Sequence, residues 1–149
     1  MRPRRATTDN AAQLASPTKG NDPTEGTKAK LMKLLIVDDD ERIRRLIKTV
    51  VADAAAVVCE CSDGAQARRS YDEHQPDWVL MDLSMPELDG IAATRQIRAA
   101  YPRARVVIVT AHDSAALREA AAGAGAVGYV VKENLLELRD ILSDPALSA

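Results

Sequence analysis

The sequence lacks any apolar run of about 20 residues, the length that a helix needs to cross a bilayer. Its N-terminal stretch, MRPRRATTDNAAQLASPTKG, also lacks the apolar core of a secretory signal. Arg, Ser and Thr give this stretch a weak similarity to a transit peptide, but Asp9 and the missing amphipathic pattern argue against one. We therefore expect no membrane contact.

Cysteine is scarce, and Cys59 and Cys61, in VVCECS, are the two in the chain. No second cysteine pair or histidine cluster accompanies them to complete a zinc site. As residues i and i+2 of a strand they would point the same way, a poor geometry for a disulfide between them. Two thiols of this kind favour a reducing compartment, so we predict a cytoplasmic protein.

The sequence also lacks an excess of basic residues, and its formal net charge is −2. Residues 1–30 carry six Lys or Arg and three Asp or Glu, whereas the rest of the chain carries fourteen and nineteen. An acidic body without a basic stripe is a poor match for nucleic-acid phosphates. We therefore expect no nucleic-acid binding by this chain.

What is present suits one soluble domain with a real core: 149 residues, 46% hydrophobic and 28% charged. Residues 1–31 hold hardly any large apolar side chains and are predicted to be a disordered tail, because burial cannot offset their ordering entropy. The folded domain is predicted to cover 32–143, with a short C-terminal stub at 144–149. Met32 is an alternative initiator, which the mass of the native protein would reveal.

From Lys33 onward, short apolar runs alternate with helical stretches. In ERIRRLIKTVVADA the apolar residues fall on one helix face, at Ile43, Leu46, Ile47, Val50 and Ala54. Val/Ile/Leu strands separated by helices indicate a parallel sheet covered on both faces, and right-handed crossovers predict a doubly wound α/β fold. Strands are expected at 33–37, 56–62, 77–82, 105–110 and 126–131, and helices at 41–54, 63–74, 90–101, 114–124 and 134–143, the fourth capped by Gly123 or Gly125.

The stretch VLMDLSMPELDG ends an apolar run on a carboxylate, Asp82, and then turns. Taken alone, Asp82 fits an ordinary turn residue, because Asp readily binds nearby backbone N–H groups. Yet polar residues occupy the same place elsewhere: Asp38–Asp40 follow the first strand, Thr110 ends the fourth and Lys132 follows the fifth. Open α/β sheets place ligand sites at these carboxyl ends, and a strand order of 2-1-3-4-5 would put Asp38, Asp39 and Asp82 in one pocket.

Such a pocket has the ingredients for phosphoryl transfer to a carboxylate. Clustered carboxylates repel one another, and Mg²⁺ bound by a few carboxylates and a phosphate oxygen would relieve that repulsion. Lys132 offers a point charge for a phosphoryl group and Thr110 a hydroxyl donor. Each residue also has a plain structural alternative: Asp38–Asp40 as a helix cap, Lys132 as a surface residue and Thr110 as a β-branched strand residue.

The motifs LLIVDDDERIRRLI, VLMDLSMPELDG, VVIVTAHD and GYVVK resemble the receiver domain of two-component response regulators over about residues 33–142. The resemblance implies a flavodoxin-like, five-stranded parallel sheet and an Asp phosphorylated by a histidine kinase or histidine phosphotransfer protein. By position it implies the following roles: Asp82 as phosphoacceptor, Asp39 as direct Mg²⁺ ligand (Mn²⁺ as a possible substitute), Asp38 as a ligand partly through water, the Ser84 backbone carbonyl as third protein ligand, and Thr110 and Lys132 as holders of the phosphoryl oxygens.

The same resemblance implies a switch and two tuning positions. Tyr129 matches the switch aromatic that moves together with Thr110, with an aromatic that merely packs on the last helix as the alternative. Ser84 and His112 match positions that control access of water to the phosphoryl group, and His112 fits an ordinary surface loop residue equally well. Many receivers have a cis-proline after the lysine, but Glu133 stands there, so the bond is either trans or strained.

YPRARVVIVTA is similar to receivers that precede a helix-turn-helix output domain, but no such stretch follows. We therefore expect a stand-alone phosphoacceptor, similar to a chemotaxis regulator, that acts through another protein or a phosphorylation-dependent homodimer. It would be a signalling domain that assists its own phosphorylation and dephosphorylation, not a turnover enzyme. A pseudo-receiver that binds proteins regardless of phosphorylation is the alternative. A phosphatase-like hydrolase is disfavoured, because a second Asp two residues after Asp82 is missing.

Overall fold

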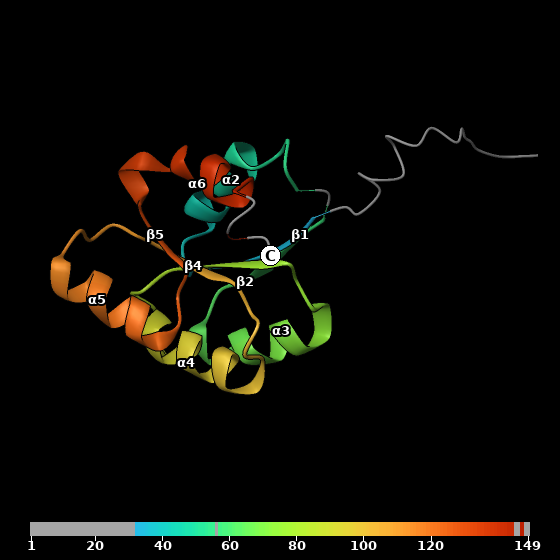
Figure 1. The fold of residues 1–149 in the computed structure, drawn as a ribbon. Helices are drawn as coiled ribbons and strands as arrows, with labels where there is room; N and C mark the ends of the chain where they lie inside the picture. Colours follow the sequence, from blue (N-terminus) through green and yellow to red (C-terminus); the bar gives the residue numbers. More distant parts are fainter. Residues whose placement is uncertain (1–31, 56, 145–146, 148–149) are drawn as a thin grey trace, which may run out of the picture. The chain divides into compact units, whose positions relative to one another are not determined.

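A computed structural model describes residues 32–55, 57–144 and 147 (Figure 1). The predicted tail at 1–31 and most of the predicted C-terminal stub lie outside the described residues. Within these described residues five strands alternate with five α-helices, and two short 3₁₀ turns lie before the second and the last helix. In chain order the elements are β1 (Lys33–Val37), α2 (Glu41–Val50), β2 (Val57–Cys61), η2 (Gly64–Gln66), α3 (Ala67–His74), β3 (Trp78–Met81), α4 (Gly90–Ala100), β4 (Val106–Thr110), α5 (Ala115–Ala124), β5 (Gly128–Val131), η3 (Lys132–Asn134) and α6 (Glu137–Leu142).

All neighbouring strands pair in parallel, in the order β2-β1-β3-β4-β5. The predicted doubly wound, flavodoxin-like fold is thereby confirmed. The register pairs Val37 with Met81, so the residues that follow β1 and β3 emerge side by side. This edge is the topological switch point of the sheet, where such folds place their ligands.

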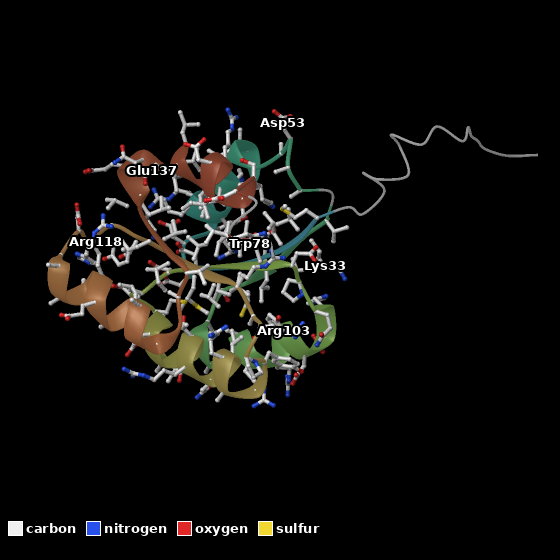
Figure 2. All side chains as sticks on the ribbon, viewed as in Figure 1. Lys33, Asp53, Trp78, Arg103, Arg118 and Glu137 are labelled. Atoms are coloured by element: carbon white, nitrogen blue, oxygen red, sulfur yellow. The ribbon has the colours of Figure 1, made fainter. Side chains whose placement is uncertain are left out.

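Two apolar clusters sandwich the sheet because successive strand residues point to opposite faces. Leu35 and Val37 of β1 face α3, α4 and α5, whereas Leu34 and Ile36 face α2 and α6. Figure 1 shows the same division, with α2 and α6 on one side of the sheet and the other three helices on the opposite side. In Figure 2 the Trp78 side chain lies in the interior, while charged side chains such as that of Glu137 lie around the outside.

The first helix is shorter than predicted and buries a different edge. It ends at Val50 instead of residue 54, and Leu46 is 48% exposed while Val51 packs in the core. The buried face of α2 is centred on Ile47. Leu46 lies at the margin of that face and is exposed to solvent. The prediction that Leu46 belongs to the packed face was therefore wrong.

The last helices match their predictions more closely. Gly125, with a φ of 107°, caps α5, which confirms one of the two glycines predicted for that role. The expected helix at 134–143 is a 3₁₀ turn followed by α6, and Leu135, Leu138 and Leu142 are buried beneath it. None of the helices in the described ranges combines the length and the apolar character of a membrane span.

Candidate functional site

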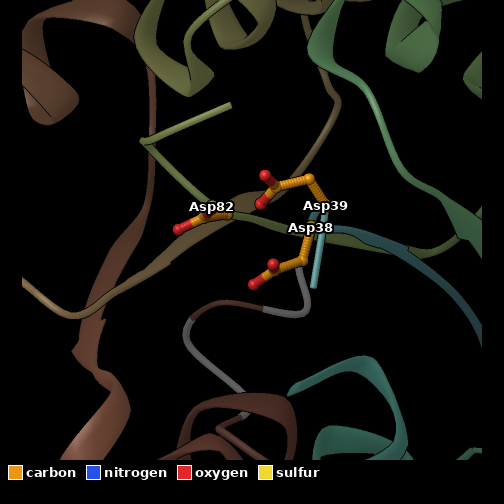
Figure 3. A group of neighbouring side chains, drawn as sticks. All are labelled: Asp38, Asp39 and Asp82. Carbon is orange, nitrogen blue, oxygen red and sulfur yellow. The ribbon is translucent and has the colours of Figure 1, made fainter. Parts of the chain in front are cut away.

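Three carboxylates meet at the edge of the sheet where β1 and β3 end. Asp38 donates its backbone N–H to the Cys61 carbonyl (3.0 Å), and Asp82 donates its own to the Val37 carbonyl (2.9 Å). These ladder bonds fix both backbones side by side beyond the strand ends. One carboxylate oxygen from each of Asp38, Asp39 and Asp82 lies within 4.8 Å of the other two, and Figure 3 shows the three side chains as neighbours. The predicted clustering of these three carboxylates is present.

The three consecutive aspartates differ in environment. Asp38 is buried, whereas Asp39 is exposed. Asp40 is the N-cap of α2, since its Oδ1 accepts the N–H of Arg42 (2.9 Å). The alternative in which the whole triplet caps the helix therefore holds for Asp40 alone. The backbone N–H of Asp40 also donates to Oδ1 of Asp38 (2.8 Å), which orients the carboxylate of Asp38.

Lys132 carries the positive charge of the pocket. Its Nζ lies 2.8 Å from Oδ2 of Asp38 and 3.3 Å from Oδ1 of Asp82. Burial works to lower the pKa of Lys132, but the two carboxylates outweigh it and hold that pKa above its usual value. Lys132 is therefore protonated at neutral pH. The bond to Glu133 is trans, so the chain places the ammonium in the pocket without the cis-proline of many receivers.

The environment of Asp82 disfavours its ionised form. Its burial, and after that the negative charge of Asp38, raise its pKa from 3.8 to about 6, although Lys132 pulls the other way. Oδ2 of Asp38 is buried and accepts no hydrogen bond of good geometry, despite its ion pair with Lys132. A set of oxygen donors with surplus negative charge and an unsatisfied buried oxygen fits a small, hard divalent cation.

Thr110 and Tyr129 are joined through the loop that follows β4. Thr110 is fully buried at the strand end, and its Oγ1 accepts the N–H of His112 (3.3 Å). The Tyr129 hydroxyl donates to the carbonyl of the same His112 (2.6 Å). Arg118 lies over the Tyr129 ring, 4.6 Å from its centroid, and its Nε donates to Asp113 (2.9 Å). The backbone of one loop residue thus bridges the two predicted switch side chains.

The two predicted tuning residues lie on a common surface. Ser84, after β3, and His112, after β4, line one cavity of about 340 Å³. Both are exposed, and their control of water access stays a prediction. The Ser84 carbonyl as a metal ligand stays a prediction.

Gly90 is a site residue that the sequence pattern did not single out. It begins α4, and a Cβ built on it would lie 2.0 Å from the Asp82 carbonyl oxygen. Its N–H donates to the Leu83 carbonyl (3.0 Å). The Asp89-Gly90 pair in VLMDLSMPELDG signals a turn, but only the structure shows that the helix start packs directly on the backbone of Asp82.

Gly90→Ala should destabilise the protein by about 1–3 kcal/mol, because backbone on both sides of the contact must shift. Gly123→Ala is the matched control: nothing lies within 4 Å of its added Cβ, and it is helical. That control should gain about 0.4–1 kcal/mol through reduced entropy of the unfolded chain. Urea denaturation of the three proteins measures both effects, and equal stabilities would disprove the close contact at Gly90.

These features define a class of protein: a doubly wound α/β domain with a carboxylate cluster and a partly buried lysine at its switch point. The sequence profile of the response regulator receiver domain matches residues 34–143. The chain therefore belongs to the family of response regulator receiver domains.

Relatives of known name support this membership. Chemotaxis protein CheY of Listeria monocytogenes is 41% identical over 103 residues, which are 68% of this chain and 87% of that protein. Chemotaxis protein CheY of Bacillus subtilis is also 41% identical, over 67% of this chain and 84% of its own length. Among solved structures, a two-component response regulator of the LuxR family from Aurantimonas sp. is 37% identical with a TM-score of 0.72, over 76% of this chain and 83% of that one.

Proposed function

We propose that this protein accepts a phosphoryl group on Asp82 from a histidine kinase or a histidine phosphotransfer protein, in a reaction that needs Mg²⁺. The observation that carries the proposal is the pocket itself: carboxylate oxygens of Asp38, Asp39 and Asp82 within 4.8 Å, and the Lys132 ammonium 2.8 Å from Asp38. A cation site, a carboxylate nucleophile and a fixed positive charge are what phosphoryl transfer to an acid requires.

The residues have distinct parts in this proposal. A carboxylate oxygen of Asp82 attacks phosphorus, the bond from phosphorus to the donor histidine nitrogen breaks, and an acyl phosphate forms. Lys132 and the Thr110 hydroxyl bind phosphoryl oxygens as charge shifts between donor and acceptor. Asp38, Asp39, Asp82 and the Ser84 carbonyl would hold Mg²⁺, which supplies neutralisation of the phosphoryl charge when bound.

Tyr129 would transmit the change to the surface formed by α5, β5 and α6. A phosphoryl group that draws the Thr110 hydroxyl toward itself would alter the Thr110–His112–Tyr129 connection, because His112 bonds to both side chains. The output would be a changed surface for a protein partner or a second copy of the chain. Unaltered hydrogen exchange at residues 111–114 and 129 after phosphorylation would exclude this switch.

A cytoplasmic location is part of the proposal, supported by the two free thiols, Cys59 and Cys61. Cell fractionation tests it, and recovery of the protein outside the cytoplasm would refute it.

The proposal predicts a mass increase of one phosphoryl group when purified protein meets acetyl phosphate and Mg²⁺. Intact-mass spectrometry measures this directly, and the increase should disappear when the metal is chelated, because the clustered carboxylates then repel the incoming phosphate. A protein that gains no mass under either condition would instead be the pseudo-receiver, a binding module that works without phosphorylation.

A further inference from the structure

Arg44 connects the acidic loop to the neighbouring strand. From α2, its Nη1 donates to the backbone carbonyl of Asp38 (2.6 Å) and its Nε donates to Oε1 of Glu60 in β2 (2.8 Å). Its side chain is only 15% exposed. Arg44 therefore spans the space between β2 and the loop that carries the pocket carboxylates.

Glu60, which accepts the Arg44 hydrogen bond, is also bonded to a second cation. It sits in β2 opposite Ile36 of β1, and its other oxygen accepts Nζ of Lys48 (2.7 Å), one helical turn after Arg44. The hydrogen bonds from Lys48 and then Arg44 hold the pKa of Glu60 below its usual value. Glu60 thus remains ionised, and it holds Arg44 in one orientation.

Asp38 is hydrogen-bonded at three of its four polar atoms, and the fourth forms an ion pair. Its N–H donates to Cys61, its carbonyl accepts from Arg44, its Oδ1 accepts from Asp40 and its Oδ2 faces Lys132. In this set, the side chain that bonds to the Asp38 backbone is that of Arg44. Arg44 itself is not part of the carboxylate cluster. Arg44 thus connects the loop after β1 to Glu60 of β2.

We propose that Arg44 is a positioning residue for the divalent cation: by holding the Asp38 carbonyl against Glu60, it sets the Asp38 and Asp39 carboxylates in the geometry that binds Mg²⁺. The inference rests on the proposed function for the identity of the cation. Outer residues that orient metal ligands typically contribute about 10–100-fold to metal affinity.

The sign of the effect separates positioning from simple charge. Removal of a cation near an acidic cluster makes the local potential more negative and should tighten Mg²⁺ binding. Loss of a positioning contact should weaken it. Lys48 offers the matched control, because it carries the same charge and its ammonium bonds to the same Glu60, while Arg44 is the residue that reaches the Asp38 carbonyl.

The test is isothermal titration of Mg²⁺ into wild type, Arg44→Met, Arg44→Lys and Lys48→Met. We expect Arg44→Met to bind Mg²⁺ about tenfold more weakly, and Lys48→Met to bind it as tightly as wild type or more tightly. Arg44→Lys should fail to restore affinity, because one ammonium cannot reproduce a planar fork that bonds to Asp38 and Glu60 together. Unchanged or tighter binding by Arg44→Met would overturn the inference.

A second measurement needs no metal. The Asp40 N–H bonds to Oδ1 of Asp38, so its hydrogen exchange in metal-free protein should speed up in Arg44→Met, while amides of β3 stay protected as evidence of an intact fold. Unchanged Asp40 exchange would overturn the positioning role even if Arg44→Met bound Mg²⁺ more weakly. Wild-type protein that binds no Mg²⁺ would overturn the proposed metal site, and the exchange experiment would still report on the loop.

Discussion

Asp82→Asn should make the metal-free protein more stable at neutral pH, by about 2–3 kcal/mol. The native fold raises the pKa of Asp82 from 3.8 to about 6, chiefly by burying it and then by placing it beside Asp38. A raised acid pKa means that the folded state binds the proton more tightly than the unfolded chain. A pKa difference of one between the folded and unfolded states corresponds to about 1.4 kcal/mol. Above pH 6, where Asp82 is ionised, this free energy destabilises the folded state. Asn keeps the shape of the side chain and removes the charge.

The pH dependence gives this prediction its control. As pH falls through 6 toward 3.8, wild-type Asp82 takes up a proton in the folded state, so the advantage of Asp82→Asn should shrink and vanish near pH 4. Asp39→Asn, at an exposed position of the same cluster, should change stability far less. Thermal denaturation in chelator across this pH range measures both variants. A melting temperature of Asp82→Asn equal to or below that of wild type at pH 7.5 would contradict the account.

Lys132→Met should have the opposite effect and destabilise the metal-free protein by about 3 kcal/mol at pH 7.5. Its ammonium lies 2.8 Å from Asp38 and 3.3 Å from Asp82, both buried, so its removal leaves two carboxylates without a cation. Met keeps much of the apolar stem in place. Saturating Mg²⁺ should restore part of the lost stability, because a bound cation takes over the neutralisation of the carboxylates.

The pH dependence again follows Asp82. The pKa of Lys132 lies above its usual value, so the lysine is protonated in both folded and unfolded states below about pH 10, and its own titration adds nothing between pH 5 and 9. Because Lys132 lowers the pKa of Asp82, its removal should raise that pKa above about 6, so the penalty of Lys132→Met should lessen as pH falls toward 6 and stay constant below it. Lys48→Met removes a partly exposed ion pair with Glu60 and should cost under about 1 kcal/mol. Chemical denaturation with and without Mg²⁺ provides the measurement, and a Lys132→Met protein as stable as Lys48→Met would contradict the account.

These two variants share one physical cause. The pocket stores unfavourable electrostatic energy around Asp82, which a metal ion and a phosphoryl group with its counter-charges would relieve. Functional sites commonly sacrifice stability in this way, and removal of the functional charge recovers it. If Asp82→Asn raises the free energy of unfolding and Lys132→Met lowers it, the unfavourable energy lies in the carboxylate charges and not in the packing around them.

Much of the site could be predicted from the sequence because of where the strands end. Asp38 and Asp82 each follow an apolar run, and parallel strands bring their carboxyl ends to one edge. Thr110 and Lys132 followed from the same rule. The pairing of the first and third strands, on which the pocket depends, required the strand order that the receiver resemblance implied.

Other features depended on three-dimensional contacts that no periodic pattern encodes. Leu46 fits the apolar period but lies at the margin of the buried face of α2, and Val51 takes its place in the core. Arg44 resembles any exposed helix charge in the sequence, since its partner Glu60 lies 16 residues away in β2. Gly90 reads as a turn residue, and its contact with the Asp82 carbonyl comes from the packing of α4 on the loop after β3.

The central claim is that Asp82 receives the phosphoryl group. Protein treated with acetyl phosphate and Mg²⁺ should be reduced with borohydride, which converts an aspartyl phosphate to homoserine, then digested and sequenced by mass spectrometry. The account predicts homoserine at position 82 and nowhere else, with the product absent in metal-free samples and in Asp82→Asn. Homoserine at Asp38, Asp39 or another carboxylate, or a phosphorylated protein that yields none at position 82, would contradict it.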